Sequence, residues 1–230
     1  MFFEPDSSGR AVVNHSARPT ARFPVTGAVY APHTYPLAFT GTPAQLASFT
    51  VETLRPATES ARAEADLWGT PLVVTEWGFD PRSDRAPDYY RFMQDLQAEY
   101  QAGAMYWVWK EQVQGAWGLF DFDAASGAWS VRPAARRLLA RVRPESIAGV
   151  PVSWAYDGAA HRLVLRVTAR DDRRGPHRIY VPDSADFAPS FTVTCDGMAA
   201  NAARDPSTGI VTVTCGGADG SAHEVVVQGS

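Results

Sequence analysis

Residues 71–78 read Pro-Leu-Val-Val-Thr-Glu-Trp-Gly, a short apolar run that ends in an acidic residue between a proline and a glycine. β-Branched and aromatic residues bounded by such breakers predict a buried strand, here 72–76. Two further segments, 29–33 and 103–109, have the same character. The intervals between the three segments leave room for one helix after each strand, as in a βαβ unit.

Helical patterns occupy these intervals and continue after the third strand. We expect a helix at about 42–66, where Pro56 is a point at which it can break, and a second at about 86–101. A third, rich in Ala, Leu and Arg, is expected at about 133–142. Alternating strands and helices are the signature of a parallel α/β sheet.

The character of the chain changes after Arg143-Pro144-Glu145-Ser146, which we interpret as a linker. Short strand patterns then follow one another, separated by segments rich in Asp, Gly, Asn and Pro and without a helical period. They cover 150–154, 161–168, 178–181, 190–195, 209–215 and 222–227. This pattern predicts an all-β sandwich, so we expect two domains, 1–145 and 146–230.

Composition excludes several classes of protein. The net charge is −4 and the sequence has no basic stripe interleaved with aromatic residues, so a nucleic-acid partner is not expected. No apolar run approaches the roughly 18 residues of a membrane helix, so we expect no stable membrane insertion. The first residues, Met-Phe-Phe-Glu-Pro-Asp, lack the basic leader and apolar core of a signal peptide.

The two cysteines, Cys195 and Cys215, follow the same tripeptide, Thr-Val-Thr, at the ends of two expected strands. They can pair as a disulfide across neighbouring strands, or they can be two independent small apolar residues, because sequence does not give the geometry. Their spacing and the lack of histidine companions argue against zinc. We therefore expect no metal and no cofactor.

Glu76 lies at the carboxyl end of its strand, and in parallel barrels this end forms the open, reactive face. Burying an unpaired carboxylate is costly, so Glu76 is either a catalytic group, a structural salt-bridge partner or a cap for the next helix. His33 and Tyr35 end the first strand, and Trp107 ends the third. An acid, an imidazole, a phenol and an indole would then project into one cleft.

These residue types suit work on a sugar. A carboxylate can attack an anomeric carbon, a tyrosine hydroxyl can hold the carboxylate oxygen, and a tryptophan face can stack on a pyranose. The histidine can bind a sugar hydroxyl, although His33 is equally compatible with an ordinary hydrogen-bonded core residue. Trp109, two residues after Trp107, is interpreted as packing inside the barrel.

At these residues the chain resembles glycoside hydrolase family 5, a family of (β/α)₈ barrels. His33-Thr34-Tyr35 is similar to its sixth-strand motif, Thr75-Glu76-Trp77-Gly78 to its seventh, and Tyr106-Trp107 to its eighth. The intervals, 76 − 35 = 41 and 107 − 76 = 31 residues, each suit one βα unit. The resemblance implies the C-terminal half of a TIM barrel, strands five to eight, with Glu76 as nucleophile and His33, Tyr35 and Trp107 as substrate-binding residues.

A β-sandwich directly after the barrel most resembles the endoglycoceramidase-like branch of the family. This implies a retaining endo-β-glycosidase that acts on a β-linked glycan or glycolipid and is secreted as a full-length protein. The alternatives are a non-catalytic carbohydrate-binding fragment and another barrel hydrolase that shares the strand-seven glutamate.

A retaining glycosidase needs a second carboxyl group about 5–5.5 Å from the nucleophile. The family carries it in an Asn-Glu-Pro motif on strand four, whereas here the only upstream Glu-Pro is Glu4-Pro5, preceded by Phe3. The interval 33 − 4 = 29 residues places Glu4 at the end of strand five, as a substrate-binding residue; the other interpretation is a displaced acid/base. We expect the acid/base to be missing, the chain alone to have little activity, and the N-terminal half of the barrel to be its partner.

Overall fold

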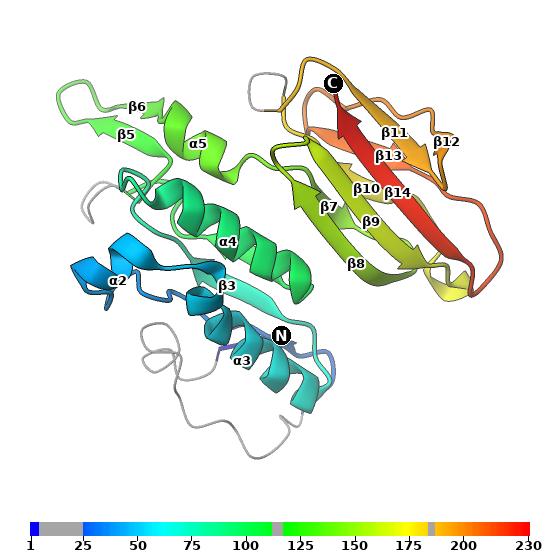
Figure 1. Ribbon diagram of the computed structural model, residues 1–230, viewed down its shortest axis with the longest axis horizontal. Helices are drawn as coiled ribbons and strands as arrows, with labels where there is room; N and C mark the ends of the chain where they lie inside the picture. Colours follow the sequence, from blue (N-terminus) through cyan, green and yellow to red (C-terminus); the bar gives the residue numbers. More distant parts are fainter. Residues whose placement is uncertain (5–24, 112–116, 184–186) are drawn as a thin grey trace. The chain divides into compact units, whose positions relative to one another are not determined.

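The computed structural model describes residues 1–4, 25–111, 117–183 and 187–230. The chain divides into two compact units, Met1–Leu139 and Ala140–Ser230. Figure 1 shows helices and short strands in the first unit and antiparallel sheets in the second. Among the described residues, no helix combines the length and the apolar character that crossing a bilayer requires.

The first unit is built on parallel strand pairs: β1 (Phe2–Phe3) pairs with β2 (Val29–Tyr30), and β3 (Val73–Trp77) pairs with β4 (Gly103–Tyr106). Parallel bridges between Tyr30 and Leu72 and between His33 and Glu76 connect β2 to β3. The strands therefore lie in chain order, and their carboxyl ends share one edge. This edge is where the residues after each strand can meet.

The helix expected at 42–66 is two helices, α2 (Pro43–Ser48) and α3 (Val51–Trp68). The break lies at Phe49 and Thr50, which have extended backbones, and not at Pro56. A capping box at Thr42 begins α2, whereas Pro56 lies inside α3, where a proline removes one backbone donor. Helix α3 ends at Gly69, whose φ of 61° suits a glycine C-cap.

Helix α4 (Ala86–Glu99) and strand β3 form the main apolar core of this unit. Tyr89, Tyr90, Met93 and Leu96 on α4 are fully buried, at the three- and four-residue spacing of a helix face. Such a side chain stabilises the fold by about 1.5–3 kcal/mol. This core holds β3 in place, and β3 in turn positions Glu76 at its end.

The last helix is α5 (Pro133–Leu139), somewhat shorter than expected. Before it lies a hairpin that the sequence did not predict, β5 (Phe120–Asp123) and β6 (Ala128–Val131). Both strands are largely exposed and lack the apolar run by which buried strands were recognised. The turn uses Gly127 at a φ of 69°, a conformation that favours glycine.

The second unit contains two antiparallel sheets. Its strands are β7 (Arg143–Ser146), β8 (Val150–Asp157), β9 (Arg162–Thr168), β10 (His177–Tyr180), β11 (Phe191–Cys195), β12 (Met198–Ala199), β13 (Ile210–Val213) and β14 (Ala222–Gly229). One sheet has the order β13-β10-β7 and the other β12-β11-β14-β9-β8. One apolar core joins them, because Leu165 and Val225 from the larger sheet and Ile179 and Val211 from the smaller are fully buried together.

The segment interpreted as a linker is strand β7 instead. It pairs with β10 and lies at the edge of its sheet, a position where a proline such as Pro144 is tolerated. Polar residues and a proline hid the strand from sequence analysis. The boundary between the two units accordingly falls after Leu139.

Candidate active site

Glu76 lies near the end of β3, and two groups contact the same oxygen of its carboxylate. The hydroxyl of Tyr35 donates a hydrogen bond to Oε2 at 3.1 Å, and Nδ1 of His33 lies 3.1 Å from that oxygen. The two segments are also joined through their backbones, since the N–H of Thr34 donates to the carbonyl of Glu76 at 2.9 Å. The segment after β2 thus fixes the orientation of this partly exposed carboxylate.

His33 connects two carboxylates. Its Nε2 lies 3.3 Å from Oε1 of Glu4, and its Nδ1 faces Glu76. Glu4 follows β1, His33 follows β2 and Glu76 is on β3, so one imidazole links the ends of three successive parallel strands. Because the ring stands between them, the two carboxylates approach it from different nitrogens.

Tyr35 is only 3% exposed. Burial and the neighbouring Glu76 carboxylate raise the pKa of Tyr35 well above its ordinary value. Both effects oppose ionisation, since a phenolate would be poorly solvated and repelled by the carboxylate. The hydroxyl therefore remains a hydrogen-bond donor to Glu76 at any ordinary pH.

Trp107 directly follows β4 and is 37% exposed, so its ring is accessible. Its backbone N–H donates to the carbonyl of Trp77 at 2.9 Å, and the peptide bond to Val108 is cis. The carbonyl oxygen of Trp107 approaches Gly78 so closely that a Cβ there would collide with it. This approach places Trp107 beside the chain two residues beyond Glu76.

Two further aromatic residues were missed in the sequence. Phe39 packs edge-on against Tyr35, with ring centroids 4.9 Å apart, and stacks on Trp117 at 5.1 Å. Phe39 is 59% exposed, so the pair presents an open aromatic surface next to the tyrosine that holds Glu76. Both residues lie outside the predicted strands and helices, and no local pattern connects positions 39 and 117.

The backbone around Trp117 is held by polar side chains. Oε1 of Glu111 accepts hydrogen bonds from the N–H groups of Trp117 at 2.6 Å and Gly118 at 3.1 Å. The hydroxyl of Tyr106 contacts the carbonyl of Trp117, and burial raises the pKa of Tyr106 to about 12. Trp109, interpreted above as barrel packing, is instead 62% exposed and meets Phe120 of the hairpin, with centroids 4.8 Å apart.

Comparison with known proteins gives this arrangement a context. Residues 141–227 match the family model of the glycoside hydrolase family 5 C-terminal domain. These residues, in the second unit, are therefore similar to the C-terminal domain of family 5, and the match covers less than half of the chain. The resemblance stated from the sequence is thereby confirmed. A search of curated proteins found no match.

Solved structures match along the whole chain. Endo-glycoceramidase II from Rhodococcus sp., in its complex with ganglioside GM3, is 23% identical with a TM-score of 0.72, covering 100% of this chain and 49% of that one. Another structure of the same enzyme is 24% identical with a TM-score of 0.71, covering 100% and 50%. Sterylglucosidase 1 from Cryptococcus neoformans is 12% identical with a TM-score of 0.60, covering 88% and 38%. The chain thus spans about half the length of the endo-glycoceramidase, and these matches establish the shared fold.

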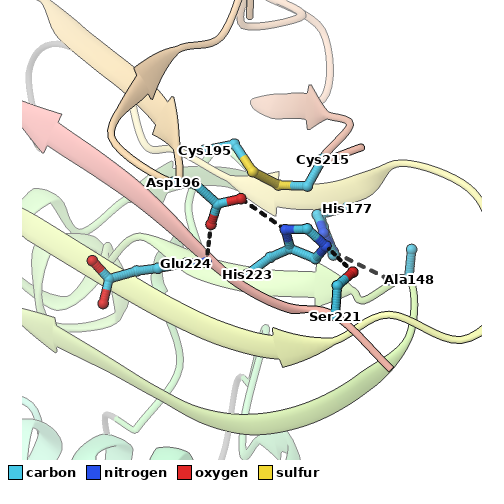
Figure 2. Close-up of a disulfide and its surroundings, with 8 residues drawn as sticks. All are labelled: Ala148, His177, Cys195, Asp196, Cys215, Ser221, His223 and Glu224. Atoms are coloured by element: carbon cyan, nitrogen blue, oxygen red, sulfur yellow. Dashed lines mark hydrogen bonds and ion pairs between the residues drawn. A yellow bond between two sulfur atoms is a disulfide. The ribbon is translucent and has the colours of Figure 1, made fainter. Parts of the chain in front are cut away.

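In the second unit the structure joins Cys195 and Cys215 in a disulfide, with Cα atoms 5.9 Å apart. Asp196 and His223 lie beside it, as Figure 2 shows. No local sequence pattern connects this histidine with the cysteines, because His223 reaches them through the pairing of β11 with β14.

Proposed function

We propose that this chain carries the nucleophile half of a retaining β-glycosidase, with Glu76 as the nucleophile. The four parallel strands then correspond to strands five to eight of a (β/α)₈ barrel, and the antiparallel sheets to its C-terminal sandwich. The observation that carries the proposal is the pair of contacts from Tyr35 and His33 to a single oxygen of Glu76. The similarity to family 5 supports it.

The contacts distinguish the two carboxylate oxygens of Glu76. Oε2 is held by the Tyr35 hydroxyl and by His33, so we assign the attack to Oε1. Oε1 forms a bond to the anomeric carbon while the bond from that carbon to the leaving oxygen breaks. Water later releases the sugar from the glycosyl-enzyme. Because Tyr35 stays protonated, its hydroxyl donates a hydrogen bond to the carboxylate of Glu76 throughout.

The substrate class follows from the surrounding groups. The exposed rings of Phe39 and Trp107 and the partly buried ring of Trp117 offer apolar contact to a sugar face or to a lipid portion. We therefore propose a β-linked glycan or glycolipid as the substrate. The Rhodococcus enzyme, whose structure was determined in complex with ganglioside GM3, has a related fold. We further propose that the full-length protein is secreted.

The acid/base is assigned to the N-terminal half of the barrel. Glu4 is the other carboxylate in the cluster, but it contacts Nε2 of His33, whereas Glu76 contacts Nδ1 on the other side of the ring. An imidazole between them keeps Glu4 from the short separation that retention requires. We assign Glu4 to substrate binding, and we expect the chain alone to hydrolyse unactivated glycosides little or not at all.

A non-catalytic carbohydrate-binding fragment is the second candidate. Phe39, which is 59% exposed and stacks on the partly buried Trp117, favours it, because an accessible aromatic face can bind a sugar without any acid or nucleophile.

The test uses a substrate that needs a nucleophile but no acid. A 2-deoxy-2-fluoro β-glycoside with a dinitrophenolate leaving group transfers its sugar without protonation, and the fluorine slows release by water. Intact mass should show one glycosyl group per chain, and peptide mapping should place it on Glu76. Glu76→Gln should remove the adduct, and the control Glu145→Gln, on β7 in the second unit, should keep it. An adduct on another residue, or none, would contradict the nucleophile assignment; glycan binding without an adduct would support the second candidate.

A further inference from the structure

A second cluster of reactive side chains lies in the C-terminal unit, around the disulfide (Figure 2). One ligand atom each from Cys195, Asp196 and His223 lies within 4.8 Å of the others. The sulfur of Cys215 is bonded to that of Cys195, so it is part of the same cluster. Two sulfurs, a carboxylate and an imidazole nitrogen therefore converge.

The strand pairing fixes this convergence. Asp196 and Gly197, with φ of 53° and 77°, form the two-residue Asp-Gly turn between β11 and β12. The backbone of Asp196 then pairs with β14, since its N–H donates to the carbonyl of Glu224 at 2.8 Å. Its Oδ1 accepts from the N–H of Glu224, also at 2.8 Å. Asp196 is thus held beside His223, the preceding residue of β14.

The hydrogen bonds around His223 fix the proton on its Nε2. The hydroxyl of Ser221 donates its single hydrogen to the carbonyl of Ala218 at 2.7 Å. Its oxygen lies 2.7 Å from Nε2 of His223 and must therefore accept a hydrogen from it. Gly217 leaves room for this contact, because a Cβ there would collide with both Ser221 Oγ and His223 Nε2.

Ser221, His223 and Asp196 contact one another in the order of a Ser-His-Asp triad, but the positions of the hydrogen atoms differ from those in a triad. In a triad the histidine accepts the serine proton, whereas here the hydroxyl hydrogen of Ser221 is already bound to Ala218. Ser221 instead orients the ring, as groups behind metal-binding histidines do. The opposite nitrogen, Nδ1, faces Oδ2 of Asp196 at 2.7 Å. Since Nε2 carries a proton, Nδ1 of His223 and Oδ2 of Asp196 can be bridged either by a second proton or by a metal cation.

We propose that reduction of the Cys195–Cys215 disulfide creates a zinc site made of the two thiolates, Asp196 and His223. A phosphine reductant takes oxygen from water and becomes a phosphine oxide, and the two sulfurs each gain a hydrogen. Zinc then displaces the thiol protons and any proton on Nδ1. Disulfide and metal centre are alternative states of the same four side chains.

The geometry and chemistry fit zinc. Zinc prefers four tetrahedral ligands from sulfur, imidazole and carboxylate at about 2.0–2.3 Å, so side-chain shifts of about 1 Å would close the site. His223 already has its supporting hydrogen bond from the ring to Ser221. A cavity of about 380 Å³, lined in part by Cys215, Gly217 and His223, offers an entry path.

Cobalt is the probe, because tetrahedral Co²⁺ bound to thiolates absorbs light and Zn²⁺ then displaces it. The full chain, reduced and freed of phosphine, should bind one Co²⁺ with a thiolate charge-transfer band, while the oxidised chain should not. His223→Gln and Asp196→Asn should each weaken binding at least about tenfold, and Ser221→Ala about tenfold through loss of the orienting hydrogen bond. The matched control is Asp157→Asn, another turn aspartate, whose Oδ1 accepts backbone N–H groups from Ala159 and Ala160.

Circular dichroism followed through the titration separates binding from folding. Metal uptake that retains or restores the β-sheet signal supports the proposal. A reduced chain that takes up no Co²⁺ overturns it, whether folded or not. Uptake that His223→Gln leaves unchanged also overturns it, because the imidazole would then not be a ligand.

Discussion

The hydroxyl of Tyr35 donates a hydrogen bond to Oε2 of Glu76 across a separation of 41 residues, at a distance of 3.1 Å. Tyr35 follows β2, Glu76 lies on the neighbouring parallel strand β3, and His33 contacts the same carboxylate oxygen. A buried, protonated phenol therefore sets the orientation of the proposed nucleophile. Its contribution can be measured separately from that of the carboxylate.

Tyr35→Phe removes the donor and keeps the ring. Loss of one donor to a charged reacting group lowers the rate by about 100-fold or more when the bond forms mainly in the transition state, and by less when it also forms in the ground state. We expect labelling of Glu76 by the fluorinated glycoside to slow at least about 10-fold. The time course of the adduct mass measures it, with Tyr156→Phe in the other unit as control. An unchanged rate would show that the hydroxyl does not act on Glu76.

Alkaline pH should destabilise the first unit. Burial raises the pKa of Tyr89, Tyr90 and Tyr106, to about 12 for Tyr106, whereas an unfolded tyrosine ionises near pH 10. The native state keeps these protons while the unfolded chain releases them, so their contribution is full below about pH 10 and falls above it. Each group can remove up to about 1.4 kcal/mol per pH unit.

Urea unfolding, followed by tyrosinate absorbance at several pH values between about 8 and 11, measures this loss. The unfolding midpoint should decrease only above about pH 10, together with ionisation of the tyrosines. A urea midpoint that stays constant up to about pH 11 would show that these hydroxyls ionise as readily in the folded protein as in the unfolded chain.

Gly78→Ala should destabilise the first unit by about 1–3 kcal/mol, the usual cost of forcing extra volume into a packed site. The new methyl group would collide with the carbonyl oxygen of Trp107, which is backbone and cannot rotate away. Urea unfolding measures the change. Gly158→Ala is the control, since its Cβ would lie 3.7 Å from the nearest atom, an ordinary contact. Equal stability of both variants would contradict the close approach.

Loss of the disulfide should destabilise the second unit. Cys195 and Cys215 are 20 residues apart, and closing a loop of this size stabilises a fold by about 3 kcal/mol through the unfolded state. The double variant Cys195→Ser, Cys215→Ser should unfold at a correspondingly lower urea concentration. The oxidised parent protein is the control. No change in midpoint would indicate that the pairing does not constrain the unfolded chain.

Sequence patterns located most elements but not all. The strands around residues 29 and 73, helix α4 and six strands of the second unit were predicted, because each has a clear apolar period between breakers. The hairpin of β5 and β6 and the edge strand β7 were missed, since their exposed faces leave no such period. The break between α2 and α3 was misplaced, because capping at Thr42 and Thr50 outweighs Pro56.

By itself the sequence determined that Glu76, His33, Tyr35 and Trp107 stand at or just beyond the ends of strands, because strand ends and helix spacing are local properties of the chain. Tertiary structure decided which distant residues meet them. The stacking of Phe39 on Trp117 and the approach of His223 to the cysteines depend on strand register and loop closure. These are set by the packing of the whole unit, so no short stretch of sequence encodes them.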